Sequence, residues 1–284
     1  MKLFQMYSFQ IVLAGTLLLA IAASIVGTMN VYKNQSLIGD ALGHSTFPGL
    51  ILAFMLSGQR NPTILLLGAM ATASLSYFLI NYSTKNSKIG ADANMAIYLS
   101  GFFGLGLVLK SYVQGNPSYS GASKSGLDNY IFGQAAYLLK ADVYLILLVA
   151  IICLACLGLF YKEIKCYLFD KDFAQILGIN GKKLDYLILF LTILVIGVGI
   201  KAVGVILISS LLIIPTITAS KLSHNFLGVI GLSSLFSCIA AFVGASISTL
   251  YSGFSTGPTI ILCQGLIGGL VMVYVKIAER RPSL

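Results

Sequence analysis

The sequence predicts an all-α, polytopic membrane protein with eight or nine transmembrane helices in a single domain spanning residues 1–284. Of its residues 57% are hydrophobic and only 10% are charged, whereas soluble domains carry about 25% charged residues. A soluble fold of this length could not hide so much apolar surface. A bilayer accepts it, because each spanning helix needs about 20 predominantly apolar residues.

Nine apolar stretches follow one another along the chain. They cover residues 9–30, 37–58, 62–81, 93–110, 142–161, 185–200, 202–219, 226–250 and 257–277. Only Lys201 separates the sixth stretch from the seventh. We therefore expect either two short spans that meet at one membrane face or one interrupted segment, which is why the helix count is eight or nine.

Basic residues predict the orientation of the chain. The net charge is +9, and membrane proteins concentrate Lys and Arg in cytoplasmic loops, so the charge does not indicate a nucleic-acid partner. The densest basic cluster lies at 162–183. Placing that loop inside puts twelve basic residues in the cytoplasm and six outside, with the N-terminus outside.

One segment between the fourth and fifth stretches differs from the rest in composition. Residues 111–128 are rich in Gly, Ser, Asn and Tyr, which is typical of an irregular loop. We expect this loop on the outer face. The short apolar stretch around Ile131–Leu139 is predicted to lie along the membrane interface.

The clearest candidate for chemistry lies at the start of the second stretch. Asp40 and His44 are four residues apart, so a helix places both on one face. Ionisable residues inside membrane spans are costly and usually functional. A carboxylate and an imidazole form half of a site for a divalent first-row metal ion. The alternative is an interfacial Asp40 that favours the helix dipole and a His44 that hydrogen-bonds a neighbouring helix.

Helix-disturbing residues surround this pair. Pro48 has no N–H, so it cannot bond the carbonyl of His44. Gly39, Gly43 and Gly49 permit close approach of other helices. The pattern predicts a helix break near the pair, and broken helices at membrane depth are tolerated where they line a cavity.

The predicted cytoplasmic loop, about residues 162–184, contains a short amphipathic pattern. It begins at Asp170, Lys171 and Asp172, and Gly178 and Gly181 are expected to end it. Its apolar residues that fit one helical face are Phe173, Ile176, Leu177 and Ile179. Such a helix could dock a partner protein, or it could lie on the lipid surface, and the pattern alone does not separate these two roles.

The segment 201–223 is apolar with a central Pro215, which frees another backbone carbonyl. Its hydroxyl side chains could satisfy the backbone or pack against other helices. We expect packing rather than substrate contact for Ser209, Ser210, Thr216 and Thr218.

Several blocks of the chain, in the same order, resemble the permease family of bacterial ABC transporters for manganese, zinc and iron. The second-stretch block is Gly39-Asp40-Ala41-Leu42-x-His44, followed by Pro48-Gly49. The other blocks are FGQ at 132–134, FDKDFAQILGI at 169–179, VGVILISSLLIIP at 203–215 and TGPTIIL at 256–262. Together they cover nearly the whole chain.

The resemblance implies a multi-pass permease of the bacterial cytoplasmic (inner) membrane. Its implied partners are a second permease copy in a homodimer, two cytoplasmic ABC ATPase subunits, an extracytoplasmic metal-binding protein and membrane lipid. Asp40 and His44 match the family's acidic and imidazole positions in the transport path. Gly43 departs from the family, which commonly has Ser or Ala there. The ATPase-coupling residues that match are Asp170, Asp172, Phe173, Ala174, Leu177 and Gly178.

Two-fold symmetry would provide a complete set of ligands for the transported ion. Two chains would bring together two imidazole nitrogens and two carboxylate oxygens around one Zn²⁺ or Mn²⁺ ion. The ion would be cargo, and no permanently bound cofactor is expected. The sequence contains no G-x-x-x-x-G-K-[ST] phosphate loop. We therefore expect a transport subunit that is not an enzyme and relies on a separate ATPase.

Specific residues and patterns argue against other functions. A metalloprotease would need H-E-x-x-H, and the chain has only His44 and His224. An ion-gradient-coupled metal transporter would show more buried carboxylates and inverted repeats. An ABC permease for a chelated iron or cobalamin ligand would not need the Asp40–His44 pair. For the metal itself, the blocks favour zinc slightly, with manganese or iron next.

Overall fold

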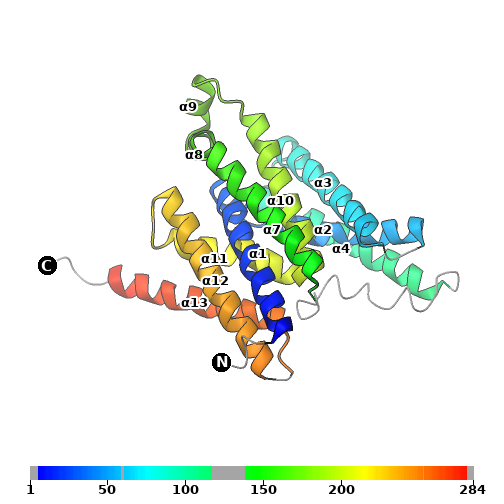
Figure 1. Ribbon diagram of the computed structural model, residues 1–284. Coiled ribbons are helices and arrows are strands. Elements are labelled where there is room, and N and C mark those ends of the chain that lie inside the picture. Colours follow the sequence, from blue (N-terminus) through cyan, green and yellow to red (C-terminus); the bar gives the residue numbers. More distant parts are fainter. Residues whose placement is uncertain (1–5, 59–60, 117–137, 252, 280–284) are drawn as a thin grey trace.

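The computed structural model of the protein describes residues 6–58, 61–116, 138–251 and 253–279. Figure 1 shows that this part of the chain consists of helices joined by short connections. The helices are α1 (Tyr7–Tyr32), α2 (Ile38–Ser57), α3 (Pro62–Asn86), α4 (Ala91–Gly115), α7 (Lys140–Leu159), α8 (Tyr161–Phe169), α9 (Lys171–Ile176), α10 (Gly181–Val203), α11 (Val205–Ser220), α12 (Phe226–Leu250) and α13 (Thr256–Glu279).

The predicted all-α membrane fold is confirmed, because each of the nine apolar stretches coincides with a helix. By length and composition, seven described helices could cross a membrane, namely α1, α3, α4, α7, α10, α12 and α13. The helix α11 is apolar but has only 16 residues. The helix α2 has 20 residues but is less apolar, because its first half carries Asp40, His44 and several hydroxyl side chains.

The break between the sixth and seventh stretches lies at Gly204, three residues after the predicted position. Gly204 has φ +87°, a conformation that glycine adopts without a steric penalty, and it separates α10 from α11. Lys201 remains helical in α10. It forms an ion pair with Asp142 at the start of α7, with Lys201 Nζ 2.6 Å from Asp142 Oδ1. Because Asp142 pairs with its charge, Lys201 can remain inside the helix.

The predicted outer loop is shorter than its composition suggested. Helix α4 continues through Gly115, so the first five residues of the 111–128 segment are helical. Apolar side chains and backbone hydrogen bonding extend the helix there despite the polar composition. Residues 117–128 lie outside the described residues, as does most of the Ile131–Leu139 stretch, so these two expectations stay predictions.

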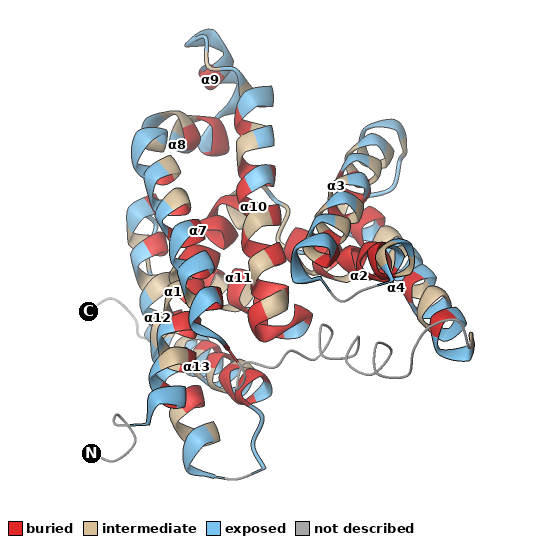
Figure 2. Cartoon of the chain, turned by 45° about the vertical axis from the view of Figure 1, so that its right-hand side comes forward, coloured by how far each residue is buried: buried red, intermediate tan, exposed pale blue. Residues whose placement is uncertain are grey.

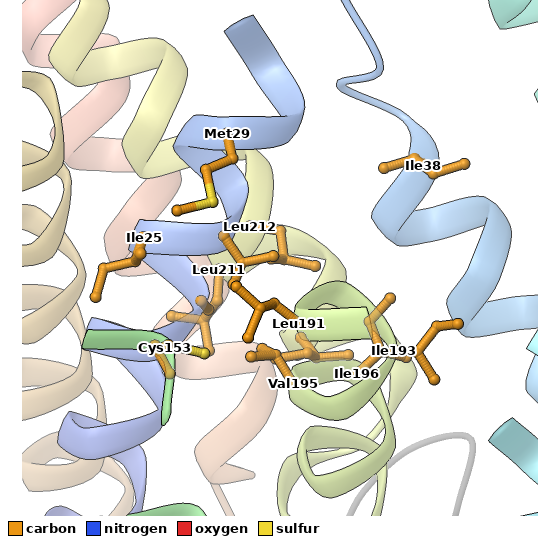
Figure 3. Packing of buried hydrophobic residues seen from close by; sticks show 14 of the residues in the cluster. Ile25, Met29, Ile38, Cys153, Leu191, Ile193, Val195, Ile196, Leu211 and Leu212 are labelled. Atoms are coloured by element: carbon orange, nitrogen blue, oxygen red, sulfur yellow. The ribbon is translucent and has the colours of Figure 1, made fainter. Parts of the chain in front are cut away.

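The hydrophobic core lies where α1, α10 and α11 pack together. Figure 2 shows buried residues concentrated on these helices, whereas α4 and α13 are largely exposed. In Figure 3, side chains from α1, α10 and α11 point toward one another. They include Ile25, Met29, Leu191, Leu211 and Leu212, each 2% exposed or less. The exposed faces of the outer helices are apolar, as lipid contact requires.

A second, smaller core joins α2, α3 and α4. It contains Phe47, Leu50, Ile51, Phe54 and Leu65, among other buried residues. Figure 1 shows these three helices together on one side of the molecule, with α2 lying crosswise to α3 and α10. The arrangement brings the first half of α2 against α11 and its second half against α3.

Candidate functional site

Asp40 and His44 lie on the same face of α2, as their spacing predicted. Asp40 is in the first turn of the helix, and its Oδ1 lies 3.4 Å from Nε2 of His44. Their side chains remain 37% and 20% exposed, respectively. The two groups therefore form a pair that is open on one side to a further ligand. An aspartate in the first turn also interacts favourably with the helix dipole.

Two other helices contribute neighbours to this pair. The Ser209 hydroxyl of α11 lies within hydrogen-bonding reach of the Asp40 carboxylate. The ring of Phe103 in α4 makes an edge contact with the imidazole of His44, with 4.9 Å between ring centroids. The surroundings of the pair are thus set by three helices, with a hydroxyl beside the carboxylate and an aromatic edge beside the imidazole.

The expected helix break near the pair is wrong, because α2 continues from Ile38 to Ser57 with Pro48 inside it. Pro48 removes only the hydrogen bond that its own N–H would donate to the His44 carbonyl. Nearby hydroxyl groups add hydrogen bonds to two other carbonyls of the preceding turn. Ser45 donates to the Ala41 carbonyl at 2.7 Å, and Thr46 donates to the Gly43 carbonyl at 2.5 Å. Tertiary packing on both sides holds the remaining turns.

The three glycines of α2 serve as contact points for other helices. A Cβ on Gly49 would lie 2.1 Å from the carbonyl oxygen of Gly68 in α3, so the two backbones touch. A Cβ on Gly39 would lie 2.6 Å from Leu212 Cδ1 of α11. The predicted close approach at these glycines therefore involves α3 and α11.

Gly43, the departure from the family pattern, lies against α11. A Cβ there would lie 3.0 Å from Cγ1 of Val205 and 3.5 Å from Oγ of Ser209. A residue with a side chain would need α11 to move by a few tenths of an ångström. Gly43 thus allows α11 to approach and bring Ser209 close to Asp40, which is a packing role and not a ligand role.

A single chain contributes one imidazole and one carboxylate at this position. Within the described ranges, no group of three or more His, Cys, Asp or Glu side chains lies close enough together to hold a metal ion. Tetrahedral sites for zinc use four ligands. A metal bound between Asp40 and His44 would need further ligands from another molecule or from solvent.

The predicted cytoplasmic loop consists mainly of two short helices, α8 and α9. Asp170 begins α9 as its N-terminal cap, since its Oδ1 accepts a hydrogen bond from the backbone N–H of Phe173 at 2.9 Å. Gly178 ends the helix with φ +78°. The Ile179 N–H donates to the Ala174 carbonyl at 2.9 Å, which completes the common glycine-terminated cap.

Gly181 does not end α9, contrary to the prediction, but is the first residue of α10. A Cβ at this position would lie 2.7 Å from Cε2 of Tyr167 in α8. The glycine is therefore explained by close packing of an aromatic ring against the start of the next helix.

The apolar face of α9 is exposed. The side chains of Phe173, Ile176 and Leu177 are 52%, 82% and 58% exposed, while Ala174 is buried. Ile179, the fourth residue of the predicted face, follows the end of α9 and packs against the core. Asp172 is exposed as well. The segment thus presents an apolar surface with one acidic residue beside it. Figure 1 shows α9 at one extreme end of the molecule.

The hydroxyl residues of α11 pack as expected. Ser210 donates to Gln264 of α13 at 2.6 Å, and Thr218 donates to the Ile214 carbonyl at 2.8 Å. Thr216 lies 3.5 Å from the hydroxyl of Thr28. Pro215 lies inside the helix and does not interrupt it. Ser209 is the exception, because it is also a neighbour of Asp40.

Sequence reasoning did not identify Ser209 or Phe103 as neighbours of the pair. It also missed the ion pair between Lys33 and Asp185, whose Nζ and Oδ1 atoms lie 2.7 Å apart. Each of these contacts joins residues far apart along the chain, and no local pattern marks them.

Comparison with known proteins places the chain in a family. The model of the ABC 3 transport family matches residues 5–275. The zinc transport system membrane protein TroC of Treponema pallidum is 34% identical over 284 residues, covering 100% of this chain and 93% of TroC. The manganese transport system membrane protein MntC of Bacillus subtilis is 39% identical over 258 residues, covering 91% of this chain but only 59% of MntC.

A solved structure shares the fold. PsaBC from Streptococcus pneumoniae, determined in complex with Fab, contains a chain that superimposes with a TM-score of 0.81 at 27% identity. The match covers 98% of this chain and 97% of that one. Because the family model spans nearly the whole sequence and the fold agrees, this chain belongs to the ABC 3 transport family.

Proposed function

We propose that this chain is the permease subunit of an ATP-driven ABC importer that moves a divalent metal ion into the cytoplasm. The names of the zinc relative TroC and the manganese relative MntC support a first-row metal ion as the cargo. The observation that carries the proposal is the Asp40–His44 pair, which is partly exposed on α2, a helix whose second half is apolar.

The exposure of the pair supports a second copy of the chain. A carboxylate that is 37% exposed on a membrane helix is costly against lipid. A two-fold axis beside α2 would cover it with the same pair from a partner chain. The four groups would then offer two nitrogens and two oxygens to one ion, a ligand set suited to Zn²⁺ or Mn²⁺.

The energy source in this proposal is a separate ATPase. The sequence has no phosphate loop of the Walker type, and α9 offers an exposed apolar face for a cytoplasmic partner. Phe173, Leu177 and Gly178 lie in the block that resembles the family's coupling loop, with Phe173 and Leu177 on that face. An extracytoplasmic metal-binding protein would deliver the ion to the outer side. ATP-driven closure of the dimer would then open the pair to each side in turn.

Zinc is the favoured cargo, followed by manganese and iron. Carboxylate and imidazole ligands accept all three ions, so the pair alone does not select among them. The relatives include proteins named for zinc, manganese and chelated iron. The preference for zinc rests on the 203–215 block and on TroC, which matches over the whole chain.

The test is metal import by the complete transporter in lipid vesicles. A chain carrying Asp40→Ala and His44→Ala should assemble normally but import at least about 100-fold less Zn²⁺ or Mn²⁺, because each bound ion loses its ligands. The matched control carries Asp92→Ala and His224→Ala, which removes the same residue types from exposed positions. Normal import by the first variant would eliminate Asp40 and His44 as the metal site.

A further inference from the structure

A series of polar contacts connects α9 with the end of α1. Lys171, the first residue of α9, places its Nζ 5.7 Å from the ring centroid of Tyr167 in α8. The Tyr167 hydroxyl donates to Oδ1 of Asp185 in α10 at 2.7 Å. The same Oδ1 lies 2.7 Å from Nζ of Lys33, which directly follows α1 and also donates to the Tyr77 hydroxyl of α3 at 3.1 Å. The Asp185 carboxylate of α10 therefore contacts α8 and the residue after α1, and Lys33 extends the series to α3.

Stability alone is a weak explanation for this arrangement. The side chain of Lys33 is 6% exposed and that of Asp185 is 36% exposed. Removing the Lys33 charge from water costs about as much as its attraction to the partly exposed carboxylate returns. The pair joins a buried helix end to a group that reaches the surface, which fits a positioning role.

Lys33 is placed where it can affect the Asp40–His44 pair. It begins the short connection 33–37 between α1 and α2, and Asp40 is the third residue of α2. Hydrogen bonds hold this connection tightly. Gln35 N–H donates to the Asn30 carbonyl at 2.9 Å, and Ile38 N–H donates to the Gln35 carbonyl at 3.1 Å. A displacement at Lys33 would be passed to the first turn of α2 instead of being absorbed by a flexible loop.

The α9 end of this series of contacts borders an open crevice. A polar crevice of about 570 Å³ is lined by Tyr167, Lys171, Gly178 and Asp185, among others. Gly178, with φ +78°, lies in the connection between α9 and α10. Burial and the hydrogen bond to Asp185 raise the pKa of Tyr167, so its hydroxyl keeps the proton that it donates.

We propose that Tyr167, Asp185 and Lys33 form a relay that transmits displacement of α9 to the start of α2. The relay rests on the proposed function, since it links the surface that faces the ATPase to the Asp40–His44 pair. Its members are positioning residues, because none of them contacts the transported ion. Within the described part of the chain, α8 reaches the ion pair through the hydrogen bond of the Tyr167 hydroxyl.

Removing that hydroxyl tests the relay with the smallest change in shape. Tyr167→Phe keeps the ring beside Gly181 and keeps the Lys33–Asp185 pair. In the complete transporter in lipid vesicles, we expect Zn²⁺ or Mn²⁺ imported per ATP hydrolysed to fall at least about fivefold, the lower range of couplings between sites. The matched control is Tyr161→Phe in the same helix, whose hydroxyl makes no hydrogen bond within the described part of the chain. Equal ratios for both variants would overturn the relay.

Hydrogen exchange gives a second readout that does not depend on the cargo. In the purified transporter, Tyr167→Phe should speed amide exchange in the connection 33–37, whereas Tyr161→Phe should leave it unchanged. Unchanged exchange in both variants would also overturn the relay. A wild-type transporter that imports neither ion would overturn the proposed function, and the exchange measurement would still decide whether α8 is linked to this connection.

Discussion

At the scale of single residues, the geometry of the Asp40–His44 pair depends on the glycines around it. Gly49 and Gly68 bring the backbones of α2 and α3 into contact, whereas Gly39 and Gly43 leave space for side chains of α11. Close helix approach through small residues is the usual way in which membrane helices gain packing energy. The pair is thus held on a helix that is fixed on two sides.

A methyl group at Gly49 should disturb this contact. In Gly49→Ala the new Cβ would lie 2.1 Å from the carbonyl oxygen of Gly68 and 2.2 Å from Oγ1 of Thr72, and overpacking of this kind costs about 1–3 kcal/mol or more. We expect a lower thermal unfolding temperature of the detergent-purified protein. The matched control is Gly104→Ala in α4, where a Cβ meets nothing within 4 Å. Equal unfolding temperatures for the two variants would contradict the proposed backbone contact.

The residues of the pair were predictable from sequence, but their neighbours were not. Asp40 and His44 stand out because charged and imidazole groups are rare in apolar spans. Ser209 and Phe103 belong to distant segments with ordinary membrane compositions, and only tertiary packing brings them to the pair. The Lys33–Asp185 contact likewise joins residues more than a hundred positions apart.

At the scale of elements, α8 and α9 form two short helices and not an irregular loop. Asp170 caps the start of α9 and Gly178 ends it. Aromatic contacts hold the preceding turn, since the ring of Phe169 lies 5.1 Å from that of Tyr32 and 6.2 Å from that of Phe226. A segment fixed in this way can present its apolar face to a partner without a large loss of conformational entropy.

A charge on the apolar face of α9 should weaken ATPase binding. Ile176 is 82% exposed, so Ile176→Asp should leave the chain folded, whereas a carboxylate buried at an interface without a partner is costly. We expect co-purification of the ATPase to fall at least about tenfold, corresponding to about 1.4 kcal/mol. Gln175→Asp adds the same charge to a neighbouring exposed position of α9 and should have a much smaller effect. Undiminished ATPase recovery with Ile176→Asp would remove this face as the docking surface.

The elements themselves were largely predictable, because long apolar runs leave the chain few alternatives to spanning helices. The ends of the elements were harder to predict. Lys201 appeared to separate two spans, but its charge is matched by Asp142, and the turn occurs at Gly204, where the backbone adopts positive φ. The polar composition after residue 110 likewise concealed one more turn of α4. At the end of α10 an ion pair and the backbone at Gly204 decided the boundary, and in α4 the added turn buries Val113 in the smaller core.

At the scale of the whole molecule, the fold presents one imidazole and one carboxylate near the crossing of α2 and α11. The first half of α2 packs in the main core with α11, whereas its second half packs in the smaller core with α3 and α4. A movement of α11 relative to α2 would change the surroundings of Asp40 directly. The proposed two-fold arrangement completes the ligand set and converts that movement into alternating access.

The most direct test of this account is the amount of metal bound at the Asp40–His44 pair. Equilibrium dialysis of the purified transporter against Zn²⁺ and Mn²⁺ should give one ion per two permease chains, and Asp40→Ala with His44→Ala should abolish this binding. The Asp92→Ala with His224→Ala control should retain it. One ion per single chain, or undiminished binding by the first variant, would contradict the shared site.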